Sequence, residues 1–78
     1  MDMRKLVGRN VRRLRLARSM TQEQFAERSG FSQQYISDLE RGLRNPTAVS
    51  LFELSQALGA APVDLLTSEH EPAASGDD

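Results

Sequence analysis

The sequence contains no cysteine and no tryptophan, and its single histidine, His70, lies near its end. Without cysteine the chain can form neither a disulfide framework nor a thiolate metal site. It also lacks a long apolar run that could span a membrane, and nothing at its start resembles a signal peptide. We therefore expect a cytoplasmic protein with no membrane partner.

Residue types that most enzymes need are missing as well. No histidine precedes residue 70, no glycine-rich phosphate loop is present, and no nucleophile can be paired with a base. Glu23 and Glu27 are carboxylates four residues apart, but this spacing on an exposed helix face is typical of solvated side chains. We predict that the protein is not an enzyme, with no catalytic residue, cofactor, metal ion or small-molecule ligand.

The overall net charge of −1 hides a strong asymmetry along the chain. All ten lysine and arginine residues lie between Arg4 and Arg44, and the first 44 residues carry only five acidic groups. Residues 45–78 carry six acidic groups and no basic one. A basic front half followed by an acidic back half fits a one-sided nucleic-acid surface better than a set of merely solvated arginines.

Few β-branched residues and a length of 78 favour one small helical domain. Val7, Val11 and Leu14 follow the spacing of a helix face, which predicts a first helix over about residues 3–18. Asp2 is well placed to be its N-cap. A composition change after residue 67 to a polar, acidic stretch predicts a disordered tail over residues 68–78.

Two short amphipathic helices, broken at Gly30, are predicted within residues 22–41. Thr21 and Gln24 have the spacing of a capping box, and Ser32 can cap the second helix. The inner faces of the two helices consist of Phe25, Ala26, Ile36 and Leu39. This is the layout of a helix-turn-helix, whose second helix enters the major groove of DNA.

Two further helices are expected after this motif. One covers about residues 48–58, capped by Thr47 and ended by Gly59, and a short fifth helix is opened by Pro62. Gly8, inside the first helix, costs about 1 kcal/mol relative to alanine. We expect close approach of a neighbouring helix to be the reason for this glycine.

Residues that match one known pattern occur in the expected order over about three-quarters of the chain: Arg15, Met20-Thr21-Gln22, Phe25-Ala26, Gly30, Tyr35-Ile36-Ser37, Leu39-Glu40-Arg41-Gly42, Asn45-Pro46, Leu54 and Ala57-Leu58-Gly59. The stretch from about Val7 to Leu66 therefore resembles the phage-repressor and Cro-like family of helix-turn-helix domains, also called the xenobiotic-response-element type. The resemblance implies an all-α fold, a compact five-helix, lambda-repressor-like DNA-binding domain over residues 1–67.

Arg15 lies beside the apolar stripe of the first helix, about 40° from Val11, and Glu40 stands in the same relation to Ile36. Opposite charges beside two facing apolar stripes predict a partly buried ion pair, and the family resemblance also implies it. The alternative is an independent surface role for each residue.

The face of the second motif helix opposite Ile36 and Leu39 is predicted to contact DNA bases. Glutamine can form bidentate hydrogen bonds with adenine, and arginine can bind guanine or phosphate. The predicted base-contacting residues are Gln33, Gln34, Ser37, Asp38 and Arg41, with the two glutamines foremost. Asp38 either accepts from a cytosine amino group or orients a neighbouring arginine, and we favour the second role.

Phosphate contacts are expected on both sides of that helix. Gln22 begins its own helix, where free backbone N–H groups attract an anion, and the family resemblance implies a phosphate contact there. Tyr35 either packs at the core edge or reaches a phosphate, and Thr47 either only caps its helix or also binds. The predicted phosphate-contacting residues are Gln22, Ser32, Tyr35, Arg44, Asn45 and Thr47.

Apolar residues outside the inward stripes predict a homodimer contact. Val49 and Phe52 are followed by Val63, Leu65 and Leu66 in the short fifth helix, and neighbouring exposed apolar residues can form an interaction patch. The predicted interface residues are Val49, Phe52, Val63 and Leu66. Alternatively, the fifth helix only closes the core of a monomer.

These features together predict a sequence-specific transcriptional regulator, either a repressor or a controller protein. It would bind a palindromic operator in double-stranded DNA as a homodimer. The alternative is an antitoxin or adaptor that uses the helical domain mainly for binding another protein.

Overall fold

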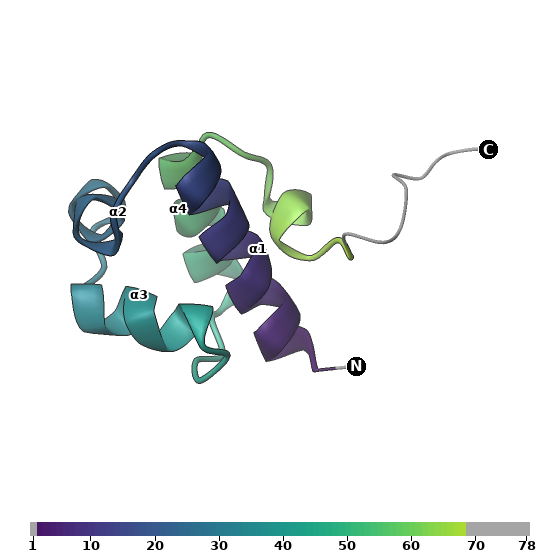
Figure 1. Ribbon diagram of the computed structural model, residues 1–78. Helices are drawn as coiled ribbons and strands as arrows, with labels where there is room; N and C mark the ends of the chain where they lie inside the picture. The colour runs from purple at the N-terminus through teal and green to yellow at the C-terminus, as the bar shows by residue number, and fades with distance from the viewer. Residues whose placement is uncertain (1, 69–78) are drawn as a thin grey trace.

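The computed structural model describes residues 2–68, and all of its regular structure is helical. Four α-helices are followed by one turn of 3₁₀ helix: α1 (Met3–Ala17), α2 (Gln22–Ser29), α3 (Gln33–Glu40), α4 (Ala48–Leu58) and η1 (Pro62–Leu65). Figure 1 shows α1 crossing the middle of the molecule, with α2 and α3 on one side and η1 on the other. The prediction of an all-α fold with a helix-turn-helix is confirmed.

The predicted fifth α-helix is wrong, because its place is taken by the single turn η1. The backbone N–H of Leu66 donates to the Val63 carbonyl, as in a 3₁₀ helix. The Thr67 hydroxyl also donates to that carbonyl, and the Asn10 side-chain amide donates to the Leu65 and Thr67 carbonyls. Side-chain donors therefore occupy carbonyl groups that would accept backbone hydrogen bonds if the helix continued. Except for Ser68, the predicted disordered tail (residues 68–78) lies outside the described residues.

Side-chain caps fix the beginning of each α-helix where the sequence predicts it. Asp2, Thr21, Ser32 and Thr47 each accept a hydrogen bond from a backbone N–H in the first turn of the helix that follows. The Gln24 side chain also accepts from the Thr21 backbone N–H, which completes the capping box. Each cap typically contributes about 1 kcal/mol, so the helix boundaries are set locally.

The core lies where α1, α2, α3 and α4 converge, and η1 covers one end of it. Its completely buried apolar residues are Val11, Phe25, Ile36, Leu39, Leu54, Leu58 and Leu65. Leu65 was expected to belong to an exposed apolar patch, and this expectation is wrong. The tight turn of η1 directs Leu65 into the core, while Val63 and Leu66 stay exposed.

Helix α1 touches the backbone of α3 at Gly8. A Cβ atom at this position would lie 2.5 Å from the carbonyl oxygen of Leu39 and 2.9 Å from that of Glu40. The close approach expected from the sequence is therefore confirmed. Because the obstructing atoms belong to the backbone, no rotamer change can relieve the contact.

A buried ion pair joins the same two helices. Arg15 Nε lies 2.6 Å from Glu40 Oε2, and Arg15 Nη2 donates to Glu40 Oε1 at 3.0 Å. The two side chains are only 8% and 3% exposed, so the predicted pair forms and is more buried than expected. Arg15 Nη1 also donates to the Met20 carbonyl, and Gln22 Nε2 donates to Glu40 Oε1. One carboxylate thus connects α1, α2 and α3.

We expect Arg15→Met to lower the free energy of unfolding by about 3–5 kcal/mol, because Glu40 would remain as a buried, unpaired carboxylate. Urea unfolding monitored by circular dichroism measures the change. Arg15→Met combined with Glu40→Leu should recover most of the loss. Equal stability of the single variant and the unsubstituted chain would contradict the assignment, and Glu27→Gln on the exposed face of α2 is the matched control.

Gly8→Ala is expected to destabilise the protein, although alanine is favoured over glycine inside a helix by about 1 kcal/mol. The new methyl group would meet the Leu39 carbonyl, and overpacking of this kind typically costs about 1–3 kcal/mol. Thermal unfolding measures the net change. A higher melting temperature for this variant would show that α1 and α3 separate easily.

Candidate nucleic-acid interface

Helix α3 presents one face to the core and the opposite face to solvent. Ile36 and Leu39 are completely buried, whereas Gln33, Gln34 and Arg41 are exposed. Ser37 is half-buried beside them. The protein's own side chains therefore leave the glutamine-bearing face open. A helix of eight residues presented in this way has the dimensions that the DNA major groove accepts.

Asp38 organises the polar groups on this face. Its Oδ1 accepts from Gln34 Nε2 at 3.0 Å and from Arg41 Nη2 at 2.8 Å, and its Oδ2 lies 3.6 Å from Arg44 Nε. These partners, the hydrogen bond from Arg41 first, hold the pKa of Asp38 below its ordinary value. The carboxylate therefore stays ionised at neutral pH. Of the two roles expected for Asp38, the structure contains the orienting one.

An aromatic stack lies at the other edge of α3. The rings of Phe31 and Tyr35 stand 4.7 Å apart at an interplanar angle of 20°, and the Arg44 guanidinium carbon lies 4.9 Å from the centre of the Tyr35 ring. Burial raises the pKa of Tyr35, while Arg44 and a hydrogen bond with Ser50 act in the opposite direction. The ring of Tyr35 thus contacts Arg44 in the loop that follows α3.

The three predicted phosphate ligands at helix starts have structural partners. The Gln22 amide donates to Glu40, so its first-turn backbone N–H is the group left to face an anion. Ser32 Oγ accepts from the Tyr35 backbone N–H, and Thr47 Oγ1 accepts from that of Ser50. The capping roles of Ser32 and Thr47 are therefore present, while Arg44 and Asn45 lie exposed in the loop after α3.

The side chains of the predicted dimer contact are exposed but lie in two places. Val49 and Phe52 are on the outer face of α4, and Phe52 borders a hollow that also involves Arg28 on α2. Leu66, which is 41% exposed, borders a different hollow between α1 and the loop before α4. Val63 is exposed on η1.

Sequence reasoning missed the completely buried Asn10, because a polar residue on an apolar stripe gives no sign of which acceptor it meets. It also missed the Phe31–Tyr35 stack, although the spacing of four residues on adjoining segments was a usable signal. Across residues 2–68, no group of three or more acidic, histidine or cysteine side chains is arranged to hold a metal ion. None of the helices in this range is long and apolar enough to cross a membrane.

Comparison with known proteins places this geometry in a family. Residues 11–66 match the family model described as "Helix-turn-helix". The chain is 61% identical over 71 residues to an uncharacterised helix-turn-helix transcriptional regulator of Sinorhizobium fredii, covering 91% of this chain and 92% of the relative. It is 44% identical over 66 residues to the control protein C.BamHI of Bacillus amyloliquefaciens, covering 83% and 82% of the two chains.

A solved structure gives the same result. The restriction–modification controller protein C.Esp1396I, crystallised as a tetramer with its natural 35 base-pair operator, superposes with a TM-score of 0.76. The two are 32% identical, and the match covers 83% of this chain and 86% of that one. The chain belongs to the helix-turn-helix family of DNA-binding transcriptional regulators.

Proposed function

We propose that this regulator binds a palindromic operator as a homodimer, with α3 of each protomer in the major groove. The observation that carries the proposal is the open face of α3, on which Gln34 and Arg41 are already held by Asp38. Side chains fixed before binding lose less conformational entropy when they meet base edges. The operator complex of the C.Esp1396I tetramer supports this mode of action.

Gln33 and Gln34 are the principal base readers in this proposal. One N–H of the Gln34 amide donates to Asp38. Its second N–H and its carbonyl oxygen are the pair of groups that adenine N7 and N6 require. Arg41 takes guanine or a phosphate, and Ser37 lies at the edge of the readout face. Asp38 acts through Gln34 and Arg41 as a positioning residue.

Phosphate contacts position the helix without selecting sequence. We assign the first-turn backbone of Gln22 to one strand, and the loop carrying Arg44 and Asn45 to the other side of the groove. The Arg44 guanidinium packs over the Tyr35 ring, and the Arg44 side chain remains 46% exposed. The capped helix starts at Ser32 and Thr47 offer additional backbone N–H groups.

In the proposed dimer, Val49, Phe52, Val63 and Leu66 meet their counterparts in a second copy. A symmetric contact would place the two α3 helices about 34 Å apart, one turn of DNA. The function is tested by selecting bound sequences from a random DNA pool. Winners with an inverted repeat at this spacing are expected. Bound sequences without a shared motif, or without symmetry, would overturn the proposal.

We expect Gln34→Ala to weaken binding to the selected operator by about 1–3 kcal/mol and to relax preference at one base position of each half-site. Competition binding against operators substituted at single positions measures the change. Gln56→Ala is the matched control, because Gln56 is an exposed glutamine on α4, away from this face.

Arg44→Ala provides the contrasting result for the Gln34 experiment. It should weaken binding to all sequences alike and reduce the slope of log K against log salt by about one unit. If Gln34→Ala instead behaves like Arg44→Ala, with uniform weakening and no change in base preference, Gln34 does not read a base.

Leu66→Arg is expected to shift the protein from dimer to monomer, because it places a charge in the apolar contact. Sedimentation equilibrium measures the association constant. Leu43→Arg is the matched control, since Leu43 is also an exposed leucine but lies in the loop after α3. An unchanged dimer in the Leu66 variant would place the interface elsewhere.

A further inference from the structure

Two arginines at the end of α3 and in the loop after it share one carboxylate. Arg41 Nη2 donates to Asp38 Oδ1 at 2.8 Å, and Arg44 Nε lies 3.6 Å from Asp38 Oδ2, so each carboxylate oxygen faces a different guanidinium. The Arg41 side chain is 62% exposed and that of Asp38 is 19% exposed, so the cation is the more accessible of the two to DNA. We refer to Arg41, Asp38 and Arg44 as the acidic bridge.

Backbone hydrogen bonds hold the two arginines in place independently of the carboxylate. The Asp38 carbonyl accepts from the backbone N–H groups of Arg41 and Leu43, at 3.1 and 2.9 Å, and the Gly42 N–H donates to the Leu39 carbonyl. The turn between the arginines therefore depends on the main chain of Asp38. Replacing its carboxyl group by an amide removes the charge, keeps the shape of the side chain and leaves this turn intact.

The carboxylate opposes binding to DNA in general. Binding to any sequence is driven by cations that meet phosphates and release the counterions condensed on the duplex. To meet a phosphate, Arg41 must either leave Asp38 or bring the carboxylate with it towards the duplex, where the negative groups repel one another. Either course costs free energy at every site that offers Arg41 nothing better than a phosphate.

At a matching sequence the same carboxylate can be accommodated. A guanidinium has five N–H donors, so Arg41 can keep its hydrogen bond with Asp38 while other N–H groups meet guanine N7 and O6. The carboxylate oxygens have further lone pairs, which a cytosine amino group can satisfy. A specific site thus compensates a charge that a random site leaves unsatisfied. A penalty that falls mainly on the wrong partner is one of the two ways to achieve specificity.

We propose that Asp38 is a specificity-determining residue, which disfavours non-operator DNA by keeping Arg41 from acting as a phosphate ligand. This inference rests on the proposed function, because it requires α3 to lie in the major groove. Asp38 acts through Arg41, and Arg44 is the second cation that stabilises the ionised carboxylate. Removing the carboxylate should therefore strengthen binding to random DNA, whereas removing a group that only positions its neighbours would not.

Asp38→Asn tests the proposal. Fluorescence anisotropy measures the affinity of the full chain for the selected operator and for a random duplex of equal length, at several salt concentrations. For the random duplex we expect tighter binding and a slope of log K against log salt that is steeper by about one unit, as for one added phosphate contact. The ratio of operator affinity to random affinity should fall about tenfold. Asp38→Glu keeps the charge and should retain the weak binding to random DNA.

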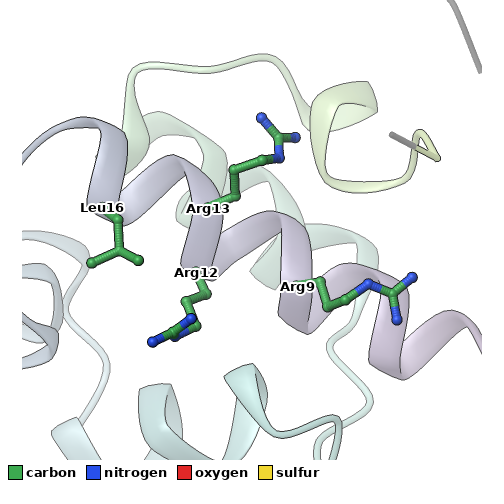
Figure 2. Close-up of a pocket in the computed structure, with 4 residues that line it drawn as sticks. All are labelled: Arg9, Arg12, Arg13 and Leu16. Atoms are coloured by element: carbon green, nitrogen blue, oxygen red, sulfur yellow. The ribbon is translucent and has the colours of Figure 1, made fainter. Parts of the chain in front are cut away.

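Double variants identify the cation that the amide releases. In the Arg41→Gln background, Asp38→Asn should no longer strengthen binding to the random duplex, because the released guanidinium is absent. Arg9→Gln is the matched control, since Arg9 is also an exposed arginine, and in its background the gain should persist. Figure 2 shows Arg9 on α1, in a hollow lined by Arg9, Arg12, Arg13 and Leu16.

Glu27→Gln controls for net charge, because it removes one exposed carboxylate from α2 and should produce little gain. Three outcomes would overturn the proposal. Asp38→Asn weakens operator binding and leaves the random duplex unchanged, or it tightens random binding equally with and without the Arg41 guanidinium, or Asp38→Glu also tightens it. Failure of the proposed function gives a different result, since the unsubstituted chain would then bind the selected operator and the random duplex equally well.

Discussion

The Arg15–Glu40 pair is the interaction on which the arrangement of the helices depends. Glu40 ends α3, Arg15 belongs to α1, and the Gln22 amide at the start of α2 donates to the same carboxylate. A buried ion pair adds little net stability compared with apolar packing, but breaking it is costly, and it tolerates few alternative geometries. The ion pair therefore contributes mainly by fixing the position of α3 relative to α1 and α2.

The exposed face of α3, the proposed recognition face, is supported by contacts on two sides. Behind α3, the ion pair and the Gly8 contact set the position of the helix backbone. In front, Asp38 sets the directions of Gln34 and Arg41, while the Tyr35 ring supports Arg44. Supporting contacts of this kind keep the side chains of a binding site within the narrow range of positions that recognition requires. The same residue types on an unsupported helix would offer the right chemistry without a defined direction.

Local sequence signals made the helix boundaries and the pairing of α1 with α3 predictable. Caps such as Thr21 and Ser32 act within one turn, so the chain itself specifies them. Helical periodicity and the family resemblance together predicted the pairing of Arg15 with Glu40. Contacts between distant segments were not accessible in this way. Asn10 meets carbonyls 55 and 57 residues away, and this decides that η1 is a single turn and that Leu65 is buried. The roles of Asp38 depended on side-chain directions that sequence spacing leaves open.

The contact between Gly8 and the carbonyls of Leu39 and Glu40 has a mechanical consequence. Two backbones in direct contact, without an intervening side chain, cannot slide or tilt as layers of flexible side chains can. Helix α3, which we propose to read the DNA, is therefore expected to move with α1 as one body. If the half-sites of a target depart from the ideal separation, the adjustment must come from bending or twisting of the duplex, or from the junction between the two subunits. If α3 reads the DNA as proposed, its fixed position on α1 would make the deformability of uncontacted base pairs part of target selection.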